Sequence, residues 1–181
     1  MKVREWNYST NKELRLFDFH DVFCGPVVRR NGNASFATTD GPNMSAEHPS
    51  NPYDAPMELG RSCITFCNVA EESFELDAGL IDNGKEERQL PRRVISSGSL
   101  YEVKQLASRI TARKELEIQI YGELREQSRE FNDEMLTWRF LCSGFLLRWN
   151  SFNRTSWFHE GEHFRIEGGR RISLGYRQNR R

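Results

Sequence analysis

The chain has 181 residues, of which 37% are hydrophobic and 29% are charged. These proportions are typical of a globular protein and exclude a disordered chain, which would carry too few apolar residues to form a core. The 26 basic side chains balance the 26 acidic ones, so the basic excess typical of a dedicated nucleic-acid binder is absent from the sequence. We expect one domain over residues 1–181.

The first third of the chain has the pattern of short strands and turns. Aromatic and aliphatic residues stand among charged ones over 14–23, which predicts a strand ending at the turn Gly25-Pro26. Asn31-Gly32 is a favourable two-residue turn and predicts a hairpin. Four prolines then fall between Asp40 and Gly60, and because proline fixes φ and lacks a donor, we expect a Pro-rich loop at about 40–60.

The middle of the chain contains the pattern of one long helix. Short strands are expected at 63–69 and 73–81, followed by a polar connection over 83–93. Ser99 and Glu102 then match the capping box that begins many helices. Apolar residues follow at helical spacing: Leu100, Val103, Leu106, Ala107 and Ile110. The sequence therefore predicts an α-helix over about 100–113.

The last third alternates between apolar and polar residues, as half-buried strands do. Strands are expected at 116–124, at 136–142 and 145–149 on either side of Gly144, and at 164–166 and 172–176 near an Arg-rich C-terminal end. The predicted fold class is α+β: a curved, mainly antiparallel β-sheet with the long helix packed on one face.

Residues 159–163 spell HEGEH, which matches the H-E-x-x-H pattern of zinc hydrolases. That pattern works because a helix brings both histidines to one metal, with the glutamate as general base. Gly161 and the neighbouring residues favour a hairpin over a helix, and no third ligand follows. We therefore predict no metal and no cofactor, and keep a zinc-dependent hydrolase using His159, Glu160 and His163 as an alternative.

Three other groups of residues could carry chemistry. Cys63 and Cys67 would lie on one face of a strand, too far apart to hold one metal, and are expected to be small buried side chains. Asp18, His20 and Asp21 could form a catalytic cluster, but no nucleophile can be assigned to them. The arginines after residue 164 could follow a phosphate backbone, which leaves a nucleic-acid-binding accessory protein as a further alternative.

The order of several segments is similar to that of a known group of proteins. "LRLFDFHDVF", the "EHPSNPYDAP" loop, "GRSCITFCNV" and "SLYEVKQL" resemble small uncharacterised bacterial proteins of a β-rich, immunity-like type. The resemblance covers roughly residues 14–150 and rests on order and spacing. It implies a protein that binds and blocks a toxin, and it carries over no functional residue.

Acidic residues concentrate in one part of the chain and predict a surface for a basic partner. The candidate partner-binding residues are Glu71, Glu72, Glu75, Asp77, Asp82, Glu86 and Glu87. The alternative is that these acids pair with arginines of the same chain. The sequence thus favours a non-enzymatic protein-binding module, an immunity-type inhibitor of a basic toxin domain. It predicts a cytoplasmic location because no apolar run could cross a membrane and residues 1–15 lack the core of a signal peptide.

Overall fold

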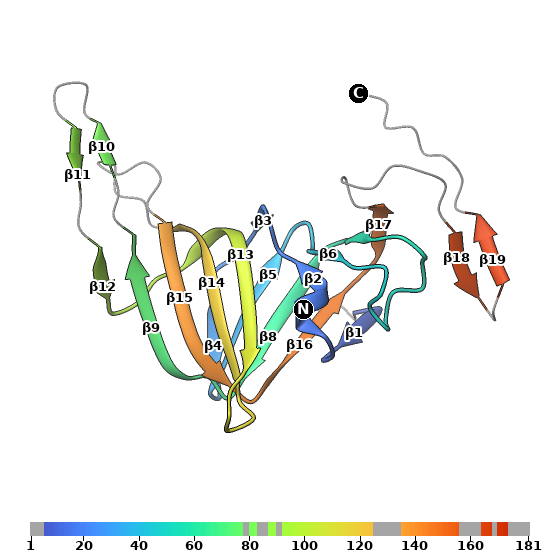
Figure 1. The fold of residues 1–181 in the computed structure, drawn as a ribbon, viewed down its shortest axis with the longest axis horizontal. Helices are drawn as coiled ribbons and strands as arrows, with labels where there is room; N and C mark the ends of the chain where they lie inside the picture. The colour runs from blue at the N-terminus through green and yellow to red at the C-terminus, as the bar shows by residue number, and fades with distance from the viewer. Residues whose placement is uncertain are drawn as a thin grey trace, which may run out of the picture.

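Two antiparallel sheets face each other in the structure, and a smaller sheet lies beside them (Figure 1). The computed structural model describes residues 6–77, 80–82, 87–89, 92–124, 135–155, 164–167 and 170–173. The five-stranded sheet has the order β1 (Tyr8–Thr10), β16 (Gly144–Trp149), β8 (Ser62–Cys67), β5 (Asn33–Thr38) and β4 (Val28–Arg30).

The facing sheet has six strands and carries the features discussed below. Its order is β12 (Arg93–Ile95), β9 (Ala70–Leu76), β15 (Met135–Cys142), β14 (Leu116–Leu124), β13 (Leu100–Ile110) and β3 (Val22–Phe23). The smaller sheet contains β17 (Phe152–Thr155), β7 (Met57–Leu59), β6 (Asn43–Met44) and β2 (Phe17–Asp18), and a 3-10 turn, η1 (Leu14–Leu16), precedes β2. Two separate hairpins are β10 (Leu80–Asp82) with β11 (Glu87–Gln89), and β18 (Phe164–Glu167) with β19 (Arg170–Ser173).

The two large sheets are joined where the chain turns a corner twice. β8 leads into β9 through Asn68, and β15 leads into β16 through Ser143. Asn68 has a positive φ of 51°, which asparagine tolerates better than most residues. Its Nδ2 donates to Ser143 Oγ at 2.9 Å, and the Ser143 N–H donates to the Cys67 carbonyl at 2.9 Å. These bonds connect the two corners to each other, so both strand pairs cross between the sheets at one place.

The core lies between the sheets and is rich in aromatic rings. Phe66 from β8 contacts Phe140 edge-on, with 4.9 Å between ring centroids, and Trp138 stacks on Phe74 at 5.8 Å. All four rings are buried, because their strands alternate inward apolar with outward polar residues. Offset and edge-on ring pairs of this kind add to the stabilisation from apolar burial.

The predicted α+β class with a helix over 100–113 is wrong. This segment forms β13, and the only helical structure among the described residues is η1. No helix covers the outer face of the six-stranded sheet there. Ser99 Oγ is buried without a hydrogen-bond partner among the described residues, so the expected capping box is not formed.

The helical spacing of β13 arises from two β-bulges. Its register against β14 shifts between Leu100 and Glu102 and again between Val103 and Gln105, with one extra residue in β13 each time. The inward residues are therefore Leu100, Val103 and Leu106, three apart instead of two. Their apolar pattern imitates a helix, whereas the last apolar residue of the pattern, Ile110, is 77% exposed.

The strand expected at 14–23 is also wrong as a single strand, because this segment forms η1, β2 and β3, but other sequence expectations hold. The strands expected at 63–69, 116–124, 136–142 and 145–149 are confirmed with small changes at their ends. The Asn31-Gly32 hairpin is also confirmed, with both residues at positive φ between β4 and β5.

The Pro-rich segment is mostly loop, as expected, although it contains β6 and β7. Hydrogen bonds hold it in place. Buried His48 accepts from the Ser50 N–H at 3.0 Å, and Asn51 Nδ2 donates to the carbonyls of Ser45 and Ala55.

The bulges bring the backbone of β13 onto Gly122, which pairs with Val103. A Cβ atom at Gly122 would collide with the Glu102 carbonyl group and would lie 3.0 Å from Val103 Cα. Because these are backbone atoms of a paired strand, they cannot move aside without breaking the ladder. Glycine at this position is therefore a steric requirement of the bulged pairing.

We expect Gly122→Ala to lower the free energy of unfolding by about 3 kcal/mol, the upper end for overpacking a well-packed site. Urea denaturation measures this change. Gly144→Ala is the matched control, because an added Cβ at Gly144 meets nothing within 4 Å. An equal loss of stability in both variants would contradict the bulged geometry.

Candidate functional site

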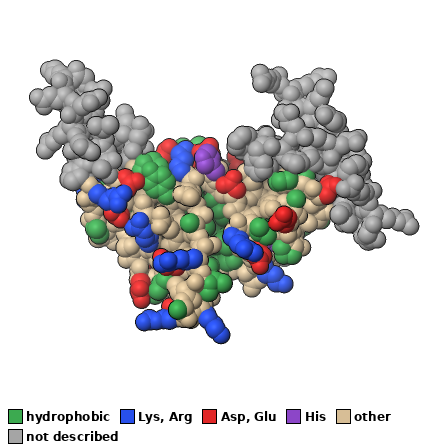
Figure 2. Space-filling model, in the orientation of Figure 1, with side chains coloured by type: hydrophobic (Ala, Val, Ile, Leu, Met, Phe, Trp, Pro, Cys, Tyr) green, Lys and Arg blue, Asp and Glu red, His purple; other side chains and the backbone are tan. Residues whose placement is uncertain are grey.

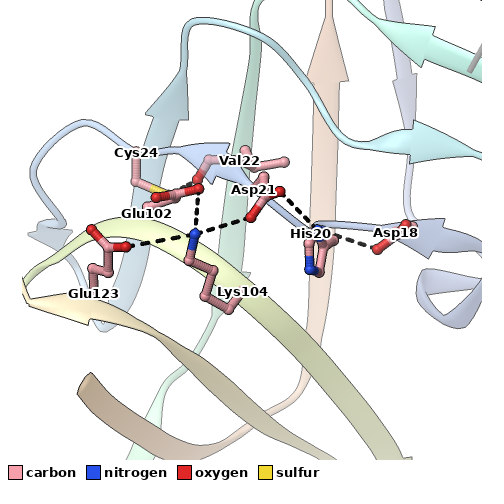
Figure 3. Close-up of polar contacts among 8 residues, drawn as sticks. All are labelled: Asp18, His20, Asp21, Val22, Cys24, Glu102, Lys104 and Glu123. Atoms are coloured by element: carbon pink, nitrogen blue, oxygen red, sulfur yellow. Dashed lines mark hydrogen bonds and ion pairs between the residues drawn. The ribbon is translucent and has the colours of Figure 1, made fainter. Parts of the chain in front are cut away.

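Lys104 lies at the centre of a group of acidic side chains on one rim of the six-stranded sheet (Figure 3). Its Nζ is 2.8 Å from Glu102 Oε1, 3.0 Å from Asp21 Oδ1 and 3.5 Å from Glu123 Oε1. Glu102 and Lys104 come from the bulged part of β13, Glu123 from β14, and Asp21 from the turn before β3. We call these residues, together with Asp18 and His20, the Lys104 cluster.

The turn between β2 and β3 positions the other acidic part of the cluster. Asp21 has a φ of 58°, a left-handed conformation that aspartate adopts more readily than most residues. The His20 N–H donates to Asp18 Oδ1 at 2.9 Å, and His20 Nδ1 lies 3.1 Å from Asp21 Oδ2. The grouping of Asp18, His20 and Asp21 expected from the sequence is therefore present, and both His20 and Asp21 are more than half exposed.

The electrostatics of the cluster favour a charged lysine. The hydrogen bond that Lys104 donates to Glu102 raises the pKa of Lys104 far above its usual value, and burial opposes this only in part. The hydrogen bond from Lys104 lowers the pKa of Asp21. Glu102 itself is buried, so its carboxylate needs the cation beside it. A lysine held as ammonium cannot act as a nucleophile or a general base, so Lys104 serves the cluster as a fixed positive charge.

Beside the cluster, β13 has an outer side without a neighbouring strand. β3 pairs only with Glu102 and Val103, and within the described residues no strand pairs with the outer side of Gln105–Ile110. We call this outer side the β13 edge. The Thr111 N–H donates to the Glu115 carbonyl at the hairpin end, and bonded and non-bonded pairs alternate from there along an antiparallel ladder. The backbone groups of Leu106, Ser108 and Ile110 therefore point away from β14.

A cleft of about 560 Å³ lies along the upper part of the β13 edge. One wall comes from the segment around η1 and β2, and the other from β13 and β14. The lining residues are Phe17, Asp18, Phe19, His20, Lys104, Gln105, Leu106 and Tyr121. The cleft thus leaves room beside an unpaired strand.

Two exposed aromatic side chains lie at the same rim. Phe23 is 44% exposed and Tyr101 is 45% exposed, and their rings meet edge-on with centroids 5.4 Å apart. In the space-filling view, acidic, basic and histidine side chains lie beside hydrophobic ones along the upper rim of the described surface (Figure 2). Aromatic side chains are enriched at protein interfaces relative to the rest of the surface.

The acids predicted to bind a partner do not all share one face. Glu72 accepts from Trp138 Nε1 at 3.0 Å and from Arg29 at 2.7 Å, and Arg29 lies over the Trp138 ring. Glu72 therefore closes one end of the core. A further bulge in β9 places Glu71 at a positive φ of 52° on the exposed surface.

Glu75 and Asp77 lie near the outer surface of the six-stranded sheet and pair with arginines. Glu75 is 2.8 Å from Arg139 and 3.3 Å from Arg92, which also lies 3.5 Å from Asp77. Arg139 holds the pKa of Glu75 below its usual value. These pairs match the alternative in which the acids neutralise arginines of the same chain.

The remaining sequence candidates fall mostly outside the described side chains. Asp82 and Glu87 pair in the backbone register of β10 and β11, and Glu86 lies outside the described residues. His159, Glu160 and His163 also lie outside the described residues, so the zinc alternative stays a prediction. Among the described residues, no group of His, Cys, Asp and Glu could hold a metal ion.

The cysteines differ in part from the expectation. Cys63 and Cys67 do lie on one face of β8, but that face is half-buried and not the core face. None of the four cysteines forms a disulfide. Of the arginines expected to contact nucleic acid, the structure describes only the backbone of those within β18 and β19.

Comparisons with known proteins place the chain in no group: no family model, no curated protein and no solved structure matches it. Within the described part of the chain, no helix is long and apolar enough to cross a membrane.

Sequence reasoning missed Lys104, Glu123 and the β13 edge, and it gave Glu102 the wrong role. They were missed because the apolar residues over 100–113 have the spacing of a helix, so the segment was not recognised as a strand. The turn that would have revealed the hairpin, Thr111–Glu115, uses Lys114 at a positive φ of 63° where glycine or asparagine is usual. The available clue was Gly122, a glycine within the otherwise alternating strand over 116–124.

We expect Lys104→Met to reduce the free energy of unfolding by about 3 kcal/mol, because buried Glu102 loses its closest cation. Denaturant titration at neutral pH measures this. The double variant Glu102→Met and Lys104→Met removes both charges and should regain much of the loss. A double variant as unstable as Lys104→Met would show that the two charges are not coupled.

Proposed function

We propose that this chain is a non-enzymatic protein-binding module that takes up an extended segment of a partner protein at the β13 edge. The observation that carries the proposal is the unpaired outer side of Gln105–Ile110 beside a cleft. An extended peptide can add to such an edge as a further strand, with main-chain bonds supplying affinity and side-chain pockets supplying specificity.

Proteins normally protect the edges of their sheets, because an open edge pairs with other chains. Protective devices are present at one end of β13, where two bulges and Lys104 lie. Beyond them the only charged side chain of the edge is Arg109, and it is held by Glu117 at 2.6 Å on the neighbouring strand. Among the described residues, the edge from Gln105 onward therefore has neither a paired strand nor a free charge that would protect it.

The chemistry around the edge favours a partner segment with a basic side chain at one end. The Lys104 cluster combines four carboxylates with one lysine, so it carries a negative balance at neutral pH. Phe23 and Tyr101 offer ring faces beside it on which an arginine can stack. A basic partner agrees with the immunity-like resemblance and its implied toxin, although the acids involved are not those expected from the sequence.

A cytoplasmic setting belongs to the same proposal. The absence of disulfides among Cys24, Cys63, Cys67 and Cys142 supports it, because cysteines of secreted domains commonly pair as disulfides. Inhibition of a cytoplasmic toxin would need binding alone.

The probe for this proposal is a fluorescent peptide of seven alternating valines and arginines, blocked at both ends. We expect it to bind the wild type and to bind Ser108→Pro about tenfold more weakly, because proline removes a donor directed to the edge and each backbone bond contributes about 1 kcal/mol. Fluorescence anisotropy measures the affinity.

Ala107→Pro is the matched control for the fold. Its N–H faces β14, so proline there should break the ladder and lower the melting temperature, whereas Ser108→Pro should leave it nearly unchanged. Unaltered peptide affinity in folded Ser108→Pro would overturn the proposal.

A further inference from the structure

We propose that a second copy of this chain closes the β13 edge when no partner is bound, with the two β13 strands paired antiparallel across a twofold axis. This inference rests on the open β13 edge of the proposed function and adds a way in which partner binding at that edge is regulated. The six-stranded sheets of the two copies would then form one continuous sheet. The interface would be isologous, because the same residues contribute from both sides.

The alternation of backbone groups restricts the register of such a pair. Only Leu106, Ser108 and Ile110 direct their N–H and C=O groups to the edge, so these residues must pair with one another. The register that uses all of them places Ser108 opposite Ser108 and Leu106 opposite Ile110 of the second copy. This register keeps the paired segment within Gln105–Thr111, clear of β3.

The side chains fit this register. Ile110 is 77% exposed, while Leu106 is half-buried against the core. Directly opposite residues on one face of an antiparallel pair have Cβ atoms about 5 Å apart. Each Ile110 would therefore be covered by Leu106 of the other copy, and this contact occurs twice.

The charges at the two ends of the edge are also complementary. Arg113 and Lys114 are exposed in the turn that follows β13, with no ion pair to another described residue. In the same register, residues 112–114 of one copy come up to the Lys104 end of the other copy's edge, where β3 pairs with Glu102 and Val103. There they meet the turn of His20 and Asp21, so a basic turn lies against the acidic Lys104 cluster at both ends.

A second copy therefore matches the edge in its backbone hydrogen-bonding groups, its apolar contacts and its charges. Pairing of two short strands buries less than the roughly 1,600 Å² of a standard interface, so the dimer should be weak and reversible. A partner segment would have to displace the second copy. Affinity for the partner would then fall as the concentration of the chain rises, by mass action.

Sedimentation velocity over a concentration series tests the inference with the full chain. We expect a reversible monomer–dimer equilibrium that weakens with added salt, and a monomer at all concentrations for Ser108→Pro. A wild type that remains monomeric at the highest concentrations, or a Ser108→Pro chain that dimerises as the wild type does, would overturn the inference.

A pair of charge variants tests the register. The first carries Arg113→Glu and Lys114→Glu, and the second carries Asp18→Lys, His20→Lys and Asp21→Asn. Each alone places like charges together at both ends and should dimerise at least about tenfold more weakly, as expected for juxtaposed like charges. Mixed together, they bring opposite charges to both ends and should form a heterodimer. Circular dichroism checks that each is folded, and no heterodimer between two folded variants would overturn this register.

The peptide probe separates this inference from the proposed function. Peptide binding by a chain that never dimerises would overturn the inference and leave the function standing. Dimerisation through the edge with no peptide binding, even at dilution where the chain is monomeric, would support the inference and overturn the function.

Discussion

The close approach of β13 to Gly122 is the constraint on which the rest of the site depends. Because residue 122 has no Cβ, the bulged backbone of Glu102 and Val103 can lie directly against β14. The bulges turn Glu102 and Lys104 toward each other and toward Asp21 on the turn before β3. β3 pairs only with the bulged residues, and the chain before it turns away at His20. Among the described residues, the edge beyond Lys104 is consequently left without a paired strand.

The two ends of the six-stranded sheet differ in how they are covered. At the β9 end, Arg29 of β4 reaches across to Glu72 and lies over Trp138, so a side-chain ion pair closes the gap between the sheets. This bridge is partly shielded and linked to a buried indole, which makes it worth more than an isolated surface pair. At the β13 end, η1 and β2 cover the core residues but leave a cleft beside the strand. One end is closed by its own side chains, and the other is open to an added strand.

A strand could be predicted from the sequence where its apolar residues kept one constant spacing. It could not be predicted where the spacing changed within the strand. β14, β15 and β16 alternate without interruption, and their inward residues could be identified. β13 changes phase twice, so its inward residues repeat every third position, and nothing in the segment alone separates that from a helix. Only the strand beside it, with glycine at 122, resolves the ambiguity. The prediction that the acids of β9 share one surface was wrong for a different reason. A bulge sends Glu72 toward the core while Glu75 stays outside, so these neighbours in sequence lie on different surfaces.

The central claim is that β13 is an edge strand with one side open, and native-state amide hydrogen exchange of this segment tests it most directly. The measurement is made by NMR at a concentration where the chain is monomeric. The account predicts an alternation: slow exchange at Ala107 and Arg109, whose amides bond to β14, and fast exchange at Leu106, Ser108 and Ile110. Uniform protection from Leu106 to Ile110 would contradict it, because a helix or a covered edge protects every amide in turn.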